Sequence, residues 1–284
     1  KSRGAEQKIS ETLNRLVAED STFKVSRDVQ THELVVTGMS NLHLEVILSR
    51  LKSRYEIDVD SRQPKIPHKE TITTKASAQY KHKKQTGGKG QYAEVYLRIE
   101  PLERGAGFEF TTKIVGGAIP SQYIPAVEKG LRETIAKGIL SNNPIADVKV
   151  ELYDGTFHNV DSSEAAFKIA ASKAFHLAFD DAKPVLLEPV VNIEVTIPSA
   201  FMGEITGNLS SRRGRVQGMD AFGDLQVVQA SIPMDEVKNY ETELKSMTGG
   251  RGSYTMEFSH YDVVPSHLVP AIITEAKKDA EKTD

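Results

Sequence analysis

The stretch KHKKQTGGKGQYAEVYLRIE, residues Lys81–Glu100, determines how the middle of this chain is expected to fold. Its second half alternates in polarity, so that one face of a strand would carry the apolar residues Ala93, Val95, Leu97 and Ile99. A strand candidate also precedes the glycines, and two strands joined by a short glycine-rich connection form a β-hairpin. The same glycines and lysines also suggest a phosphate cradle, and therefore nucleotide chemistry.

The spacing of these residues excludes the nucleotide interpretation. A P-loop requires GxxxxGK[ST] with a helix directly after it, because the hydroxyl binds Mg²⁺ and the helix N-terminus binds phosphate. Here Gly90 is followed by Gln91, and the next residues alternate as a strand. The sequence supplies no other GK[ST] motif, so we expect this chain not to bind GTP or ATP.

The charge around the hairpin is strongly positive. Between Thr71 and Ala93 there are lysines but no acid, although the chain as a whole carries a net charge of −3: Lys75, Lys81, Lys83, Lys84 and Lys89. Such a block is either a solvated surface or a contact with a polyanion. Glycines that simply permit a tight turn would explain the loop but not the lysines. A protruding basic hairpin that ends in Gln91 and Tyr92 has the chemistry to contact RNA.

Composition limits the other classes of function. The 284 residues contain no cysteine, which excludes disulfides and thiolate metal sites and suits a reducing cytoplasm. The eight histidines show no HExxH or comparable spacing, so no metal site is expected. No apolar run reaches the roughly 18 residues that a membrane span needs. The first residues are polar, and no signal peptide is expected.

Three domains of α+β class are expected, with boundaries near prolines: residues 1–66, 67–188 and 189–284. The last segment predicts the order βαββαβ, which is the ferredoxin-like split βαβ pattern, followed by a polar tail. The first segment predicts helix, two strands, helix and a short strand at Ile57–Asp60. It matches the same pattern without an opening strand, so we expect the chain to begin inside a domain.

The middle segment predicts a long strand over Glu70–Lys83, the hairpin, and two helices. The first helix runs from Ile124 to Ile135, with Gly138 placed to cap its C-terminus. The second starts near Ser163, after the stretch HNVDSS, where Asp161 followed by Glu164 resembles a capping box.

His158 lies in the loop before this second helix. A catalytic triad of His158, Asp161 and Ser162 is rejected, because residues this close together in sequence are better explained as the N-cap of the helix. A lone loop histidine is usually only a polar surface residue. The functional alternative is a contact residue on a loop beside the glycine hairpin.

Two glycine-arginine turns occur in the last segment. Arg212 and Arg213 precede Gly214 at the predicted end of a helix, and Arg251 lies in TGGRGSY. Arginines near a helix C-terminus complement its dipole without any ligand. Together they could also form a basic edge that faces RNA.

Several long motifs, in order, resemble the C-terminal three domains of bacterial translation elongation factor G over essentially the whole chain. They are VTGMSNLHLEVILSRLKSRY, QTGGKGQYAEV, IVGGAIPSQYIPAVEKG, FHNVDSSEAAFKIAASKAF, KPVLLEPVVNIEV, GNLSSRRGRVQGM and TGGRGSYTMEFSHYDVVP. The resemblance implies domains three to five, with domain four a β-α-β domain of ribosomal-protein type between two ferredoxin-like domains. It also implies a cytoplasmic fragment whose GTPase domain, with GTP and Mg²⁺, and β-barrel domain lie outside this chain.

The resemblance further implies a function in translocation of tRNA and mRNA on the ribosome, with no catalytic residue in this chain. Domain four would enter the decoding centre through its tip residues Gly87, Gly88, Lys89, Gly90, Gln91, Tyr92 and His158. The last domain would approach ribosomal RNA of the large subunit through Arg212, Arg213 and Arg251.

Departures from the usual motifs, such as Ser40-Asn41 for Gly-Glu and Asn159 for an acid, indicate a divergent second elongation factor G paralogue. Ribosome recycling and ribosome protection against antibiotics therefore stay open as alternatives. A free-standing RNA-binding protein is a further alternative, and a hydrolase is the weakest.

Overall fold

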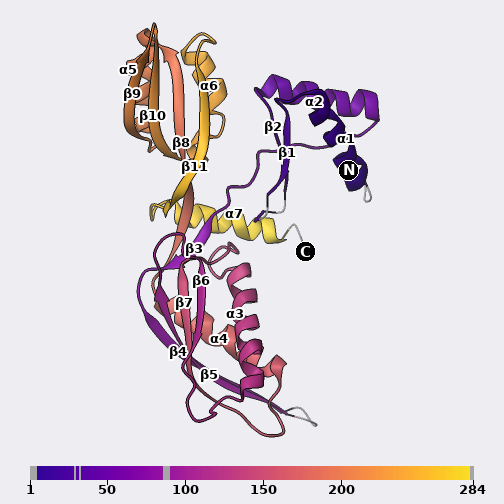
Figure 1. Ribbon diagram of the computed structural model, residues 1–284, viewed down its shortest axis with the longest axis vertical. Coiled ribbons are helices and arrows are strands. Elements are labelled where there is room, and N and C mark those ends of the chain that lie inside the picture. Colours follow the sequence, from indigo (N-terminus) through magenta and orange to yellow (C-terminus); the bar gives the residue numbers. More distant parts are fainter. Residues whose placement is uncertain (1–4, 29, 32, 86–89, 282–284) are drawn as a thin grey trace. The chain divides into compact units, whose positions relative to one another are not determined.

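The computed structural model describes residues 5–28, 30–31, 33–85 and 90–281. The chain forms two compact units, one of residues 1–67 with 191–257 and the other of residues 68–190 with 258–284. Both units contain helices together with largely antiparallel strands (Figure 1), which confirms the predicted α+β class. The predicted division into three domains stays a prediction.

The first part of the chain is an α-β-β-α arrangement. Helices α1 (Ala5–Glu19) and α2 (Asn41–Tyr55) bury leucines and isoleucines against the antiparallel pair β1 (Lys24–Arg27) and β2 (Leu34–Thr37). The predicted strand at Ile57–Asp60 is wrong. Glu56 adopts a left-handed conformation after α2, and Ile57 donates its N–H to the Leu51 carbonyl, so the chain turns back instead of extending.

The last part of the chain has the predicted order βαββαβ. It comprises β8 (Pro184–Pro198), α5 (Met202–Ser211), β9 (Arg215–Phe222), β10 (Leu225–Pro233), α6 (Tyr240–Met247) and β11 (Ser253–Val263). The sheet order is β11-β8-β10-β9, as the split βαβ pattern requires. Alternate residues of β8 and β10 are buried with Ile205 of α5 and Leu244 of α6. Helix α7 (Val269–Glu281) follows.

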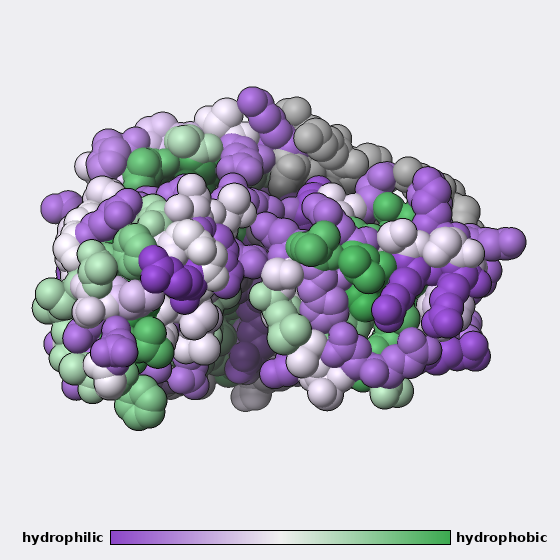
Figure 2. Space-filling view, turned by 90° about the horizontal axis from the view of Figure 1, so that it is seen from above, coloured by the Kyte–Doolittle hydropathy of each residue, from purple (hydrophilic) through white to green (hydrophobic). Residues whose placement is uncertain are grey.

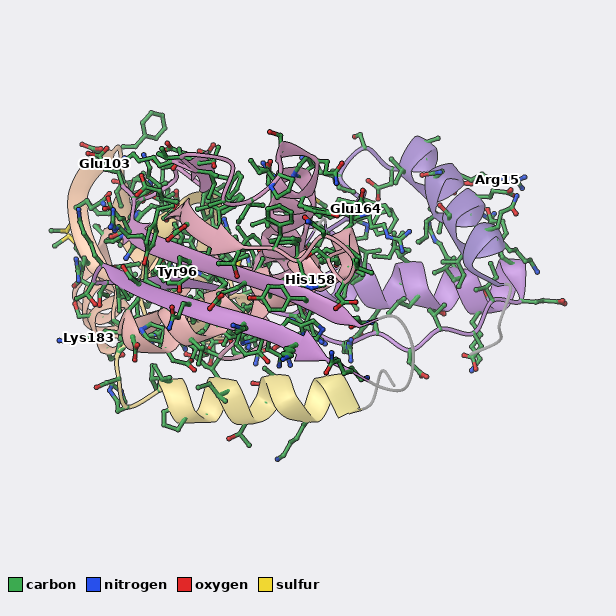
Figure 3. The ribbon with its side chains drawn as sticks, turned by 90° about the horizontal axis from the view of Figure 1, so that it is seen from below. Arg15, Tyr96, Glu103, His158, Glu164 and Lys183 are labelled. Atoms are coloured by element: carbon green, nitrogen blue, oxygen red, sulfur yellow. The ribbon has the colours of Figure 1, made fainter. Side chains whose placement is uncertain are left out.

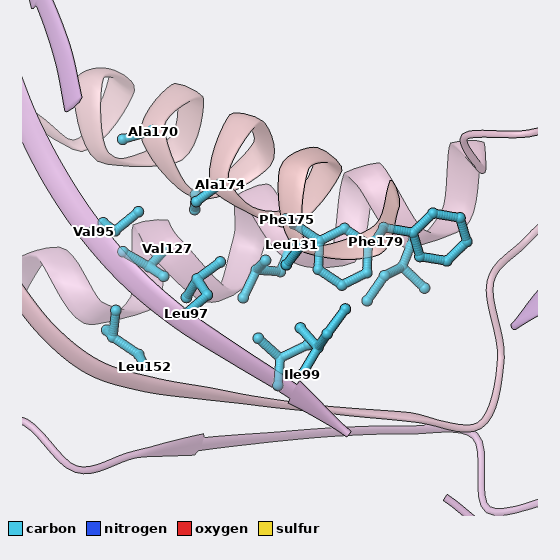
Figure 4. Close-up of a cluster of buried hydrophobic side chains, with 14 of the residues drawn as sticks. Val95, Leu97, Ile99, Val127, Leu131, Leu152, Ala170, Ala174, Phe175 and Phe179 are labelled. Carbon is cyan, nitrogen blue, oxygen red and sulfur yellow. The ribbon is translucent and has the colours of Figure 1, made fainter. Parts of the chain in front are cut away.

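The middle part of the chain is a four-stranded sheet of order β4-β5-β7-β6. Its strands are β4 (Ala76–Lys84), β5 (Gln91–Pro101), β6 (Phe108–Thr112) and β7 (Val148–Thr156), and only the β6–β7 pair is parallel. Helices α3 (Ile124–Lys137) and α4 (Glu164–Asp181) cover one face (Figure 4). The predicted apolar face of β5 is confirmed, because Ala93, Val95, Leu97 and Ile99 are all fully buried against these helices.

Two predictions about the middle part are wrong. The strand expected over Glu70–Lys83 is divided into β3 (Lys69–Ile72), which pairs with β8, and β4 of the hairpin. The break falls at Thr73 and Thr74, whose N–H groups both bond to the Ala182 carbonyl. The N-cap of α4 is Ser163, which accepts from Ala166 N–H, and not Asp161. Asp161 is used elsewhere, as shown below.

Figure 2 shows one face, on which hydrophobic side chains lie among hydrophilic ones. Among the helices that the structure describes, none has the length and apolar content to cross a bilayer.

Candidate nucleic-acid interface

Two chain segments meet at one end of the four-stranded sheet. Strands β4 and β5 pair as far as Lys84 opposite Gln91, and β7 ends at Thr156 opposite Glu94 of β5. The loop that follows β7 therefore begins beside the end of the hairpin. We call residues 90–92 and 157–162 together the tip. Figure 3 shows His158 at the same end as Glu164, the first residue of α4. The predicted site residues Gly87, Gly88 and Lys89 lie outside the described residues.

Asp161 and Ser162 join the two segments by a set of hydrogen bonds that we call the latch. The Asp161 carboxylate accepts from Gly90 N–H at 3.0 Å, and its carbonyl accepts from Tyr92 N–H at 2.9 Å. The Ser162 hydroxyl donates to the Tyr92 carbonyl at 2.8 Å and accepts from His158 N–H at 2.9 Å. The loop after β7 is thus fixed to the hairpin on both sides of Gln91.

Gly90 lies directly against the Asp161 side chain. A Cβ atom at position 90 would come within 2.9 Å of the Asp161 carboxyl carbon, and its backbone is not in the left-handed region. The glycine therefore permits close approach of a side chain rather than an unusual turn. At Gly90 this differs from the alternative in which the glycine only permits a tight turn.

The ring of His158 is oriented by its own loop and faces outward. Its Nδ1 atom accepts from the N–H groups of Val160 at 3.3 Å and Asp161 at 3.2 Å. The same Nδ1 atom lies 3.4 Å from Asp161 Oδ2. The side chain is 55% exposed, so the ring is available to a partner. No catalytic triad forms, since the Ser162 hydroxyl donates to a backbone carbonyl and not to this ring.

Tyr92 is held in place rather than free. Its hydroxyl lies 2.7 Å from Thr156 Oγ1, and its ring centre is 6.3 Å from the His158 ring. The ammonium group of Lys81 lies 5.2 Å above the Tyr92 ring, and interaction with this hydroxyl and with Glu94 raises the pKa of Lys81. Gln91 is exposed, and its amide oxygen lies 3.0 Å from His82 Nε2. The Lys81 ammonium also pairs with the Glu94 carboxylate at 3.8 Å. The tip therefore offers Gln91 and His158 on a fixed frame.

The three predicted arginines all have partners within the chain. Arg212 is largely buried, bonds to the Glu236 carbonyl and the Glu243 carboxylate, and lies over the Tyr240 ring. Arg213 pairs with Glu236 at 2.9 Å. The Arg251 guanidinium lies 5.0 Å from the centre of the Phe201 ring. These contacts give each arginine a role in packing, and their contact with RNA stays a prediction.

Tyr240, beneath Arg212, is a buried tyrosine whose hydroxyl has no hydrogen-bond partner among the residues that the structure describes. Burial raises its pKa to about 12. We expect Tyr240→Phe to keep the ring packing and to change the free energy of unfolding by less than about 1 kcal/mol at pH 7, because no hydrogen bond is lost. The pKa of Tyr240 is about 10 in the unfolded state and higher in the folded state. Its contribution to the free energy of unfolding is therefore fully present below pH 10 and is lost as the pH rises toward 12.

Tyr240→Phe should therefore lose less stability than the wild type between pH 9.5 and about 11.5. Urea unfolding followed by far-ultraviolet circular dichroism at both pH values measures this difference. Equal losses of stability in the two proteins would contradict the prediction that deprotonation of Tyr240 destabilises the fold at high pH.

Three family models match consecutive parts of the chain: elongation factor G domain III at residues 1–63, domain IV at 64–183, and the elongation factor G C-terminus at 185–272. The chain belongs to the elongation factor G family. The tip lies wholly within the domain IV match, and the three arginines lie within the C-terminus match.

Known relatives agree with this assignment. An elongation factor G-like protein from Thermotoga maritima is 46% identical over the full length of the chain. A crystal structure of a protein from Thermus thermophilus matches 98% of the chain with a TM-score of 0.83 and 43% identity. The chain spans 42% of the length of each of these relatives.

Sequence reasoning missed the latch, which joins the hairpin to the loop after β7. Asp161 was assigned to a helix cap because it precedes Glu164 by three residues. Its actual partner, Gly90, is 71 residues away, and no local pattern relates the two positions. The described residues contain no cluster of histidine and carboxylate side chains that could bind a metal ion.

Proposed function

We propose that this chain is the ribosome-binding C-terminal part of a translational GTPase that promotes movement of tRNA and mRNA during protein synthesis. The tip of the domain IV region would enter the decoding centre of the small subunit. GTP and Mg²⁺ would be bound by another part of the parent protein, and the three domains in this chain would act mechanically. Ribosomes as partners imply a cytoplasmic protein.

The observation that carries the proposal is the pre-organised tip. The latch joins two segments into one frame, and that frame presents His158 and Gln91 to solvent. Groups already fixed in their binding geometry lose little conformational entropy when they contact RNA. Lys83 and Lys84 are also exposed beside the tip, where they would favour phosphate.

The match to a relative named elongation factor G-like protein supports the expectation of a divergent paralogue. The residues that differ from the usual family motifs, Ser40, Asn41 and Asn159, would then modify the translocation mechanism that the family shares. The measurements below distinguish translocation from other ribosomal roles because they follow movement of the mRNA directly.

The proposal predicts that His158→Ala in the full-length parent slows single-turnover translocation by about tenfold, the equivalent of one lost hydrogen bond in the rate-limiting state. GTP hydrolysis on the ribosome should stay at the wild-type rate, because the tip takes no part in it. Translocation is followed by a fluorescent mRNA and hydrolysis by phosphate release. His260→Ala, at another exposed histidine, is the matched control. Unchanged translocation in His158→Ala would refute the assignment of the tip.

A further inference from the structure

A groove lies between α3 and α4, on the side of the helix pair where the polar residues of both helices gather. Its volume is about 500 Å³, and the polar residues that line it include Glu133, Lys137, Asn142, Lys168, Lys173 and His176. We call it the helix groove. The two helices pack closely beside it: Thr134 Oγ1 lies 2.8 Å from Ser172 Oγ, and a Cβ at Gly130 would lie 2.6 Å from the Lys168 carbonyl oxygen.

The helix groove is positively charged within an acidic chain. Three lysines line it against one glutamate, and Glu133 pairs with Lys168 at 2.6 Å. Lys137 and Lys173 are exposed and form no ion pair with any residue that the structure describes. Two ammonium groups are therefore available to a ligand.

His176 lies half-buried in the groove, and the lysines nearby affect its pKa. Burial is the largest cause that lowers its pKa, and the charges of Lys173 and Lys137 lower the pKa further, while Asp180 and Glu70 oppose them. At pH 7 the ring is neutral, so it adds a polar nitrogen to the lining without a charge of its own.

Helix stability accounts for one of these two lysines. Lysines near a helix C-terminus complement its dipole, and Lys137 lies in the last turn of α3. Lys173 lies eight residues before Asp181, the last residue of α4, and outside its last turn.

A row of cations continues along the helix pair. A second hollow of about 240 Å³ is lined by Gln122, Lys129, Glu164 and Lys168, so that Lys168 belongs to both. From Lys129 to Lys137 the axis of α3 rises about 12 Å, which is longer than a single phosphate group. The arrangement fits a chain of phosphates better than one small anion.

We propose that the helix groove binds the phosphodiester backbone of RNA, as a contact separate from the tip. This proposal rests on the proposed function in that the RNA would be ribosomal. Lys137 and Lys173 would each contact a phosphate, and the Asn142 amide and His176 would contribute neutral hydrogen bonds. Since such contacts touch no base edge, binding would be independent of sequence.

The test uses the chain of residues 1–284 and a fluorescein-labelled oligouridine, with binding followed by anisotropy at several salt concentrations. Lys137→Gln/Lys173→Gln should raise Kd roughly tenfold at low salt and reduce the slope of log K against log salt by about two. Lys8→Gln/Lys24→Gln removes the same charge from exposed positions elsewhere and should change both quantities much less. Glutamine keeps the helices intact, which circular dichroism checks.

A second readout locates the ligand. In the wild type, oligouridine should shift the ring-proton NMR signals of His176, and inorganic phosphate alone should shift them only at far higher concentration. Absence of binding, equal Kd and slope in the two double variants, or unmoved His176 signals would each overturn the proposal. These readouts do not involve translocation. A negative result for the helix groove is therefore distinguishable from a negative result for the proposed function of the tip, which His158→Ala tests in the parent.

Discussion

Replacing Glu70 by alanine is expected to lower the free energy of unfolding of the 68–190 part by about 3–5 kcal/mol. This residue belongs to β3, and its side chain is completely buried. A buried carboxylate is tolerated only when hydrogen bonds replace the water that it loses. The Glu70 carboxylate accepts such hydrogen bonds from several backbone N–H groups and one hydroxyl.

The Glu70 carboxylate fixes the loop between α3 and β7 through hydrogen bonds from the backbone N–H groups of that loop. It accepts from the N–H groups of Ile139 at 2.8 Å, Leu140 at 2.9 Å, Ser141 at 2.8 Å and Asn143 at 3.3 Å, and from the Ser141 hydroxyl at 3.1 Å. Its main chain also bonds to Pro144 and Ala146. Alanine would leave several donors without a partner in the same small space, and each buried unsatisfied donor costs about 1–3 kcal/mol.

Urea unfolding followed by circular dichroism measures the loss. The free energy of unfolding of Glu70→Gln should lie between those of Glu70→Ala and the wild type. The amide oxygen still accepts hydrogen bonds, while the NH₂ group faces other donors. The control is Glu109→Gln, which breaks an exposed pair with Lys149 at 3.0 Å and should have a much smaller effect. A loss below about 1 kcal/mol for Glu70→Ala would contradict the role assigned to this carboxylate.

Local periodicity explains which parts of the fold were predicted. The alternation of Ala93, Val95, Leu97 and Ile99 identified β5, because side chains of a strand point to opposite faces in turn. The order βαββαβ of the last segment followed from similar patterns. The family was recognised because long motifs kept their order along the chain.

The residues that were misplaced have distant partners. Glu70 was expected to lie in one long strand with Lys83, but its side chain bonds to residues about 70 positions later and its strand pairs with β8. Asp161 was assigned to a cap that Ser163 provides instead. In both cases a carboxylate satisfies backbone donors far away in sequence, and single-sequence patterns carry no information about such contacts.

Removing the latch is expected to disable the tip in the full-length parent as strongly as removing His158. Ser162→Ala deletes the donor to the Tyr92 carbonyl and the acceptor for His158 N–H in one step. The segments would then sample several relative positions, and RNA contacts would have to order them first. We expect single-turnover translocation to slow by about tenfold or more, with GTP hydrolysis unchanged.

The neighbouring serine provides the matched control for Ser162. Ser163→Ala removes the N-cap of α4, which should cost about 1 kcal/mol of stability but leave the latch and translocation intact. Ser162→Thr keeps the hydroxyl and should restore the rate. Amide hydrogen exchange at Gly90 should accelerate in Asp161→Ala, because the carboxylate is the acceptor of that amide, whereas Tyr92 N–H bonds to the Asp161 main-chain carbonyl, which alanine keeps, and should change less. If Ser163→Ala slowed translocation as much as Ser162→Ala, helix stability rather than the latch would control the tip.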